Sequence, residues 1–125
     1  MKYKLVERRN PTKPDDAKKW YASAVKAGTI DINRLAKEIS TKSSLSRGEV
    51  LNIIETLLDA VPDYLKDGYT VSLGRFGSIR LTLSSEGIEN RDNFNTSLIK
   101  GGHLILTPSV PLKTELQNIP LERVE

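Results

Sequence analysis

The alternation of apolar and polar positions is clearest in the middle of the chain, at residues 71–83. Apolar side chains occupy every second position on both sides of a Gly-Arg-Phe-Gly centre, namely Val71, Leu73, Ile79, Leu81 and Leu83. This spacing is typical of half-buried strands. Gly74 and Gly77 can adopt positive φ in a tight turn. The stretch is therefore predicted to be a β-hairpin, with Phe76 available to anchor its turn on a core.

Helical spacing precedes the hairpin. Apolar residues at positions 32, 35, 36 and 39 share one face of a short helix, which Asp31 is placed to cap. After a Ser- and Thr-rich break, Ser46 and Glu49 have the spacing of a capping box, which predicts the start of a second helix. An apolar stripe follows at positions 50, 53, 54, 57, 58 and 61. Pro62 is expected to kink or end this helix near Val61.

The first thirty residues have the pattern of a short strand, at Tyr3 and Leu5, and then a loop at residues 10–16. Residues 20–27 fit either a capped helix or a strand that returns against residues 2–8, and we expect the strand. Trp20, the single tryptophan, is expected to pack this extension on the body of the protein rather than to contact a ligand.

Residues 84–102, after the hairpin, are mostly polar. A structureless loop of this length is uncommon inside a compact domain, so we expect an extended two-stranded arm that turns near residues 90–93. Residues 103–107 return to a strand pattern, and Ser109 is placed to cap a short final helix. Residues 118–125 are expected to be a frayed tail.

The composition of the chain excludes several kinds of site. The chain has 125 residues and no cysteine, which excludes a disulfide framework and thiol-ligated metal sites. The start has no signal-peptide core, and no run approaches the ~18 apolar residues of a membrane span, so we expect a soluble protein that does not bind membranes. No enzyme motif is present, and His103 has no second histidine to form a metal site. We therefore expect neither an enzyme nor a cofactor, metal or small-molecule substrate.

Charge is unevenly distributed. Residues 1–28 carry eight Lys or Arg against Glu7, Asp15 and Asp16, a net charge of +5, while the whole chain has +3 and the remaining 97 residues −2. A basic leader on a slightly acidic body suggests a segment that faces a polyanion. A solvated basic terminus without a partner is the alternative.

The order of the predicted elements resembles the HU/IHF family of bacterial histone-like DNA-bending proteins. The segment Leu73-Gly74-Arg75-Phe76-Gly77-Ser78-Ile79 is similar to the hairpin signature of that family, Gly-Phe-Gly-[Ser/Asn]-Phe. Leu106-Thr107-Pro108 corresponds to the Phe-Lys-Pro before the last helix of the family, and Leu65-Lys66-Asp67-Gly68 to its helix-to-strand turn. The resemblance covers roughly residues 30–118.

The resemblance implies an α+β fold and an intertwined homodimer. Each chain would contribute a helical pair, a three-stranded antiparallel sheet with an extended β-arm, and a short C-terminal helix. The implied division is a basic N-terminal extension at 1–29 with short β elements, an HU/IHF-like domain at 30–118 with its arm at about 84–103, and a tail at 119–125. Physical reasoning also favours a dimer, because two helices and a small sheet cannot cover the apolar stripe of the second helix.

The implied function is that of a nucleoid-associated, cytoplasmic protein that binds and bends duplex DNA with little sequence preference. Arg75 at the hairpin corner is placed either to enter a minor groove or to lie in solvent, and Arg80 lies on the polar face of the second strand. Arg91 is near the arm tip, and Lys113 matches a lysine of the family. The full set of predicted DNA-binding residues is Arg75, Arg80, Arg91, Lys100, His103 and Lys113, with possible contacts from Lys2, Lys4, Arg8 and Arg9 of the extension.

The arm departs from the family pattern. Between residues 84 and 103 it has only Arg91 and Lys100 as full cations, against Glu86, Glu89 and Asp92, and it lacks the proline of the family tip. Each missing cation–phosphate pair lowers the slope of log affinity against log salt by about 0.9, so an arm of this composition should bind weakly by itself. The alternative function is a dimeric protein-interaction or structural module of the same fold with weak or no DNA binding.

Overall fold

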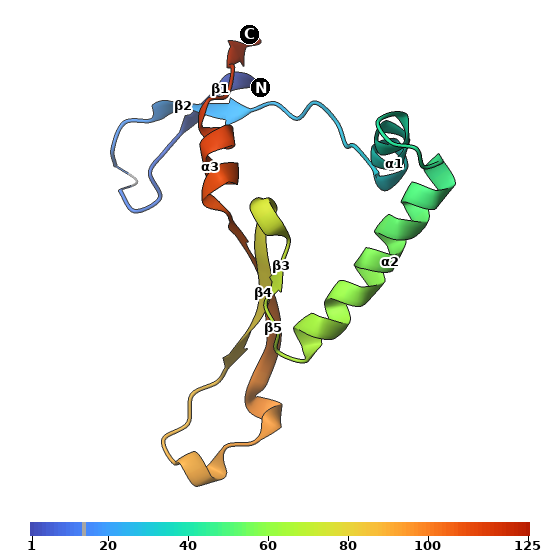
Figure 1. The fold of residues 1–125 in the computed structure, drawn as a ribbon. Helices are drawn as coiled ribbons and strands as arrows, with labels where there is room; N and C mark the ends of the chain where they lie inside the picture. Colours follow the sequence, from blue (N-terminus) through green and yellow to red (C-terminus); the bar gives the residue numbers. More distant parts are fainter. Residues whose placement is uncertain (14) are drawn as a thin grey trace. The chain divides into compact units, whose positions relative to one another are not determined.

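The computed structural model describes residues 1–13 and 15–125. The chain forms two compact units, the extension unit (Met1–Ile30 with Leu116–Glu125) and the arm unit (Asp31–Glu115). Each unit contains one three-stranded sheet (Figure 1). The mixed α+β fold is confirmed. The loop predicted at residues 10–16 includes Pro14, which lies outside the described residues.

The extension unit is a small sheet of order β2-β1-β6. Strand β1 (Lys2–Arg8) pairs antiparallel with β2 (Lys19–Ala24), from Tyr3 opposite Ala24 to Arg8 opposite Lys19. The strand expected to return against residues 2–8 is therefore confirmed. Trp20 lies on this sheet and is 64% exposed, and its packing on the rest of the protein stays a prediction.

The end of the chain corrects the expectation of a frayed tail. Strand β6 (Glu122–Arg123) pairs parallel with the free edge of β1. The amide of Leu5 donates to Oε1 of Glu125 at 2.6 Å, and the terminal ammonium of Met1 donates to the carbonyl of Pro120 at 2.6 Å. The open edge of β1 presents unpaired backbone groups, which the end of the chain satisfies.

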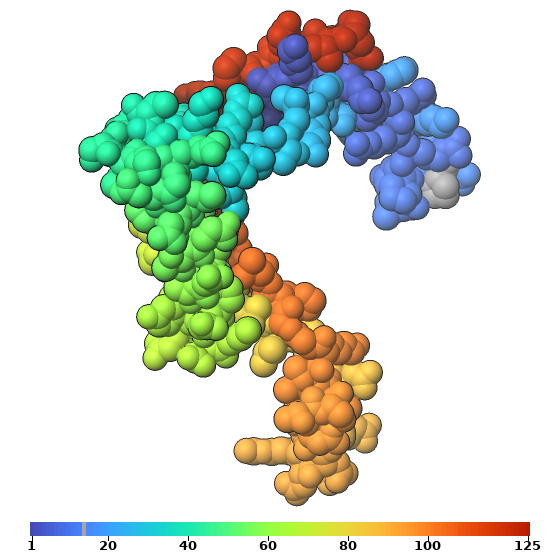
Figure 2. Space-filling model, turned by 90° about the vertical axis from the view of Figure 1, so that its right-hand side faces the viewer, coloured from blue at the N-terminus to red at the C-terminus, as the bar shows by residue number. Residues whose placement is uncertain are grey.

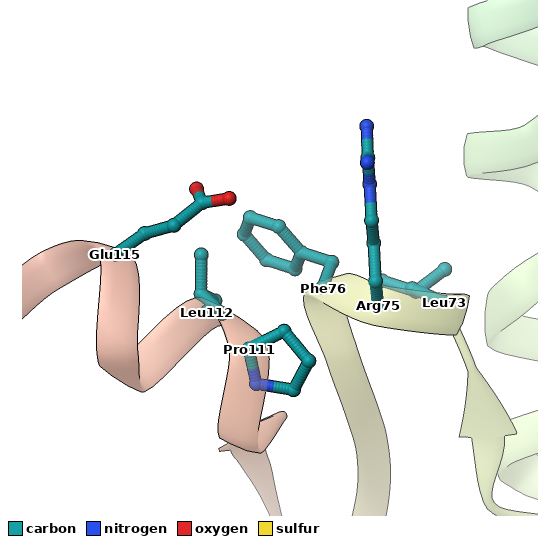
Figure 3. A pocket seen from close by; sticks show the side chains of 6 residues that line it. All are labelled: Leu73, Arg75, Phe76, Pro111, Leu112 and Glu115. Atoms are coloured by element: carbon teal, nitrogen blue, oxygen red, sulfur yellow. The ribbon is translucent and has the colours of Figure 1, made fainter.

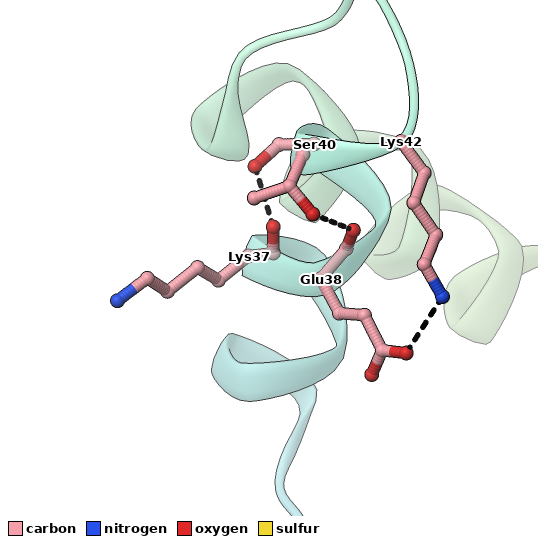
Figure 4. Close-up of polar contacts among 5 residues, drawn as sticks. Lys37, Glu38, Ser40 and Lys42 are labelled. Carbon is pink, nitrogen blue, oxygen red and sulfur yellow. Dashed lines mark hydrogen bonds and ion pairs between the residues drawn. The ribbon is translucent and has the colours of Figure 1, made fainter.

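Helix α1 (Ile32–Thr41) begins as expected, since the side chain of Asp31 accepts a hydrogen bond from the amide of Arg34 at 2.9 Å. Its last turn is held by local polar contacts (Figure 4). The hydroxyl of Ser40 donates to the carbonyl of Lys37 at 2.7 Å, and Nζ of Lys42 lies 3.0 Å from Oε1 of Glu38. Side chains that bond the last carbonyls in this way help to end the helix within the Ser- and Thr-rich segment.

Helix α2 (Arg47–Lys66) begins with the predicted capping box of Ser46 and Glu49. Pro62 is expected to kink or end the helix near Val61. The helix does not end there, because it continues through Pro62 to Lys66, and the kink stays a prediction. Proline removes one backbone donor but leaves the later hydrogen bonds possible. The last turn is also held by packing, since Leu65 is only 8% exposed.

The arm unit contains the sheet β3-β4-β5. The predicted hairpin is confirmed by the pairing of β3 (Val71–Ser72) with β4 (Gly77–Ser85) around a 3-10 turn at Gly74–Phe76. Both turn glycines have positive φ, 63° at Gly74 and 137° at Gly77. A Cβ at Gly77 would lie 2.3 Å from the carbonyl oxygen of Thr107, so the glycine also permits the close approach of two backbones.

Strands β4 and β5 (Ile99–Pro108) form the base of the arm, but the two-stranded structure ends at Ser85 opposite Ile99. The prediction of paired strands up to residues 90–93 is therefore wrong, whereas the predicted turn near these residues does occur, at Arg91–Asn93. Residues 86–98 contain two 3-10 turns, Arg91–Asn93 and Thr96–Leu98. The side chains of Asn90 and Asn95 accept hydrogen bonds from the amides of Asp92 and Ser97, and such local bonds compete with strand pairing.

Helix α3 (Val110–Gln117) follows β5. The predicted cap is confirmed, because the amide of Leu112 donates to the hydroxyl of Ser109 at 3.2 Å. Phe76 does not anchor the hairpin in a core as expected. It is 50% exposed and lies beside Leu112 at the edge of a small hollow (Figure 3).

The apolar residues of the arm unit are mostly uncovered. Only Ala36, Val50 and Leu65 are buried hydrophobic residues in the part of the chain that the structure describes. The stripe of α2 and the apolar side of the sheet remain open, with Ile53 57%, Leu57 49%, Leu58 47%, Leu81 41%, Leu83 68%, Leu104 63% and Leu106 50% exposed. Among the described residues, no helix has the length and apolar character needed to cross a membrane.

Candidate nucleic-acid interface

The two faces of the β4–β5 ladder differ in chemistry. Successive residues of a strand point to opposite faces, and residues opposite each other on paired strands share a face. The apolar face carries Ile79 opposite Leu106 and Leu81 opposite Leu104. The polar face carries Ser78 opposite Thr107, Arg80 opposite Ile105, Thr82 opposite His103, and Ser84 opposite Gly101.

His103 is held on the polar face by its neighbours on β4. Its Nε2 lies 3.3 Å from the hydroxyl of Ser84, and the hydroxyl of Thr82 donates to the His103 carbonyl at 3.4 Å. Arg80 is two residues before Thr82 and so lies on the same face, about 7 Å further along the strand. The ladder thus brings two of the predicted site residues, Arg80 and His103, onto one surface with two hydroxyl groups.

Lys100 lies at an irregularity of the ladder. Ser84 pairs with Gly101 and Ser85 with Ile99, so the register passes over Lys100. An extra residue of this kind forms a β-bulge, which bends the strand and redirects a side chain. Gly101 beside it has φ of 105°, a value that side chains other than glycine rarely tolerate. Lys100 therefore marks the point where the regular ladder passes into the arm tip.

The charges of the arm are separated along its length. The paired strands, residues 77–85 and 99–108, contain Arg80 and Lys100 as full cations and no acidic residue. The acids Glu86, Glu89 and Asp92 all lie in the tip, residues 86–98. The sequence showed a mixed arm, whereas the structure shows a cationic ladder and an acidic tip.

Arg91 lies in this tip, in the first 3-10 turn. Residues 86–97 are all exposed, and the tip stands clear of helix α2 (Figure 2, orange and green). Asp92 follows Arg91 directly, but no ion pair between them occurs in the described structure. Arg91 is therefore free to contact a ligand. It lies outside the paired strands and so is not part of the polar face that carries Arg80.

Arg75 lies in a second region, at the corner of the hairpin, and Lys113 lies in helix α3. The hydroxyl of Ser109 donates to the carbonyl of Arg75, which connects this corner to the start of α3. The side chain of Arg75 extends away from the turn, while Phe76 and Leu112 face each other (Figure 3). The hollow here has about 270 Å³ and is lined by Leu73, Arg75, Phe76, Pro111, Leu112 and Glu115.

Three of the four predicted contacts of the extension unit lie on β1. Lys2, Lys4 and Arg8 are separated by even numbers of residues, so they share one face of the strand. Arg9 comes after the end of the strand. In the described residues, no group of three or more His, Asp or Glu side chains could hold a metal ion.

Sequence reasoning missed part of each surface. Thr82 and Ser84 could not be predicted as part of the polar face, because only the pairing of β4 with β5 places them beside His103. Lys19 and Tyr21 were missed for the same reason, since only the pairing of β2 with β1 places them beside Arg8 and Val6. Alternation within each strand was visible in the sequence, but the register between strands was not.

Comparison with known proteins gives a family match along nearly the whole chain. The family described as "HU domain fused to wHTH, Ig, or Glycine-rich motif" matches residues 1–123. No curated protein matches the sequence. A crystal structure from Bacteroides vulgatus ATCC 8482, of a candidate bacterial DNA-binding protein, has a similar fold with a TM-score of 0.64 and 15% sequence identity. The similarity covers 98% of this chain, which spans about half, 47%, of that chain.

Proposed function

We propose, from the premise that this chain belongs to the family of HU domains fused to wHTH, Ig or glycine-rich motifs, that it binds duplex DNA. The membership confirms the resemblance seen in the sequence. The observation that carries the proposal is the β4–β5 ladder, whose polar face presents Arg80, His103, Thr82 and Ser84, with Lys100 at the adjacent bulge and no acid on either strand.

This surface suits contacts to the DNA backbone. Arg, Lys and hydroxyl side chains are typical donors to phosphate oxygens, and such contacts position a protein on DNA without reading its sequence. The surface has no Asn or Gln among its cross-strand pairs, the residues that pair with adenine edges. We therefore infer binding with little sequence preference. Arg75, Arg91 and Lys113 are further proposed contacts, outside the ladder face.

We also propose a homodimer. The arm unit has only three buried apolar residues among those described, while Ile53, Leu57 and Leu58 of α2 are about half exposed. A contiguous apolar surface of this kind is normally covered, and a second copy of the same chain provides a self-complementary cover. Two copies would supply two arms, which allows the protein to hold and bend one duplex. The DNA-binding domain would comprise residues 30–118. The protein would act in the bacterial nucleoid.

The direct test is fluorescence anisotropy with a labelled duplex at low salt and again at about 0.2 M. The variant Arg80→Gln/Arg91→Gln/Lys100→Gln should bind DNA roughly tenfold more weakly and with a shallower salt dependence, since the slope falls by about 0.9 for every phosphate that is no longer neutralised. The matched control is Arg34→Gln/Arg47→Gln/Lys37→Gln, which removes the same charges from exposed helix positions and should bind as the wild type does. No binding by the wild type at low salt would refute the proposal.

The acidic tip favours one second candidate, a dimeric module that binds protein through its arms. Glu86, Glu89 and Asp92 are exposed there and would repel phosphates. Reversing the charges with Arg80→Glu/Arg91→Glu/Lys100→Glu separates the two functions. A DNA-binding arm loses its affinity for DNA in this variant, whereas a protein-binding module shows no DNA affinity to lose.

A further inference from the structure

The extension unit has one strongly basic sheet face. The β1–β2 register places Arg8 opposite Lys19, Val6 opposite Tyr21 and Lys4 opposite Ser23. Lys2 lies on this side as well, because it is two residues from Lys4. We call this surface the basic face. The opposite side of the same two strands carries Tyr3, Leu5, Glu7, Trp20, Ala22 and Ala24, so the sheet separates a cationic side from a mostly apolar side.

The four cations of the basic face have no internal partners. Lys2, Lys4, Arg8 and Lys19 are all exposed, and none of them forms an ion pair with another described residue. One acid, Glu122 of β6, lies opposite Lys2 at the edge of the sheet. Asp16 is a second acid, in the loop beside Arg8 and Lys19. Four exposed cations against these two acids leave a positive field on this face.

The face is hollowed where Arg8 meets Tyr21. A depression of about 350 Å³ is lined by Arg8, Arg9, Asn10, Pro11 and Tyr21. A smaller adjoining depression of about 50 Å³ is lined by Arg8, Asn10, Asp16, Ala17, Lys19 and Tyr21. Guanidinium, ammonium, amide and phenol groups around a concave surface are donors suited to phosphate oxygens. Asp16 is the one acid at this depression.

We infer that the basic face is a second DNA-contacting surface, formed by Lys2, Lys4, Arg8 and Lys19 with Tyr21, that binds backbone phosphates. From Lys2 to Arg8 the row of cations extends about 20 Å along β1. Duplex DNA carries one negative charge per about 1.7 Å of its axis, so phosphates are available along the whole row. This inference rests on the proposed function, since it names DNA as the shared partner of both surfaces.

A nucleic acid fits the face better than an anionic membrane does. Surface binding to membranes combines cations with apolar side chains that enter the lipid from the same face. Here Trp20, the most exposed aromatic side chain of the two strands, lies on the opposite side of the sheet. The basic face has Tyr21, 44% exposed and ending in a hydroxyl, and Val6, which is only partly exposed. The basic face therefore offers charge and hydrogen-bond donors, with the phenol of Tyr21 as its one exposed aromatic group and no exposed aliphatic side chain to enter a lipid layer.

The test compares two variants of equal charge loss. Lys4→Gln/Arg8→Gln/Lys19→Gln removes two lysines and one arginine from the basic face, and Lys37→Gln/Arg47→Gln/Lys66→Gln removes the same from helices α1 and α2. Affinity for a duplex is measured by anisotropy between about 50 and 200 mM salt. Circular dichroism and thermal melting of both proteins establish that each is folded.

We expect the basic-face variant to bind DNA roughly tenfold more weakly, with the salt slope reduced by about 0.9 for each phosphate no longer neutralised, and the helix variant to be unchanged. Equal affinity of the two variants for DNA would overturn the inference. It would leave the proposed function intact, because the arm variant Arg80→Gln/Arg91→Gln/Lys100→Gln tests the arm independently. Wild-type protein that binds vesicles of phosphatidylcholine and phosphatidylglycerol through the basic face, but not DNA, would also overturn it.

Discussion

Gly77 shows how one residue determines the hairpin corner. Its φ is 137°, and an added Cβ would meet the Thr107 carbonyl oxygen at 2.3 Å and the Pro108 Cα at 2.9 Å. Both neighbours are backbone atoms and cannot rotate away. We predict that Gly77→Ala lowers the free energy of unfolding by about 2–4 kcal/mol, measured by urea denaturation at fixed protein concentration.

Gly87 is the matched control for this substitution. Nothing lies within 4 Å of a Cβ added there, and its φ is outside the strained range. Gly87→Ala should change the free energy of unfolding by no more than about 0.5 kcal/mol. A Gly77→Ala protein as stable as the control would show that the two backbones separate at little cost.

Ser109 stabilises the corner from the other side. Its hydroxyl accepts from the amide of Leu112 at 3.2 Å and donates to the carbonyl of Arg75. Ser109→Ala removes both bonds and is expected to lower the free energy of unfolding by about 1 kcal/mol. Ser109→Thr retains the hydroxyl and should keep most of the stability; loss of stability in both variants to the same degree would contradict a capping role.

At the residue scale, local signals were the ones that the sequence revealed. Asp31, Ser46 with Glu49, and the glycines of the hairpin turn act within a few residues of their own position, and all were predicted. The bond from Ser109 to Arg75 joins residues 34 apart in the sequence. Such a bond depends on the pairing of two strands and has no local signature.

At the scale of elements, α2 shows where local rules give way to packing. Pro62 leaves the Leu58 carbonyl without its helical donor, yet the helix continues to Lys66. We predict that Pro62→Ala raises the free energy of unfolding by about 1–2 kcal/mol. The restored helical hydrogen bond stabilises the folded state by more than the added conformational entropy stabilises the unfolded chain. Thermal and urea unfolding measure the change. Asp63→Ala, at the adjacent exposed position, should be nearly neutral, and a less stable Pro62→Ala protein would contradict the prediction.

The errors made at this scale have two physical causes. The arm tip was expected to be paired strand, but the Asx side chains of Asn90 and Asn95 favour 3-10 turns through bonds to nearby amides. The sequence predicts a frayed tail, but strand β6 (Glu122–Arg123) pairs with β1, which lies at the other end of the sequence. Short strands of this kind gain their stability from the edge that they cover and not from their own composition.

At the scale of the whole molecule, charge and apolar surface are divided between faces of each sheet. The arm sheet has a polar face with Arg80 and His103 and an apolar face with Leu81 and Leu104. The extension sheet repeats the arrangement, with Arg8 on one side and Trp20 on the other. This division could not be seen in the net charge, and it separates the surface that we propose to contact DNA from the surface that we propose to form the dimer.

The apolar surface of α2 gives the last prediction. Leu57 is 49% exposed in the middle of the stripe that we propose to be the dimer interface. In a dimer, Leu57→Glu would bury an unpaired carboxylate in each copy, which is strongly unfavourable. We expect its dimer dissociation constant to rise at least about 100-fold, equivalent to about 3 kcal/mol, as measured by sedimentation equilibrium. Asn52→Glu adds the same charge at an exposed polar position of α2 and should leave the dimer intact. A wild-type protein that sediments as a monomer, or a Leu57→Glu protein that still dimerises with wild-type affinity, would show that a different partner covers this stripe.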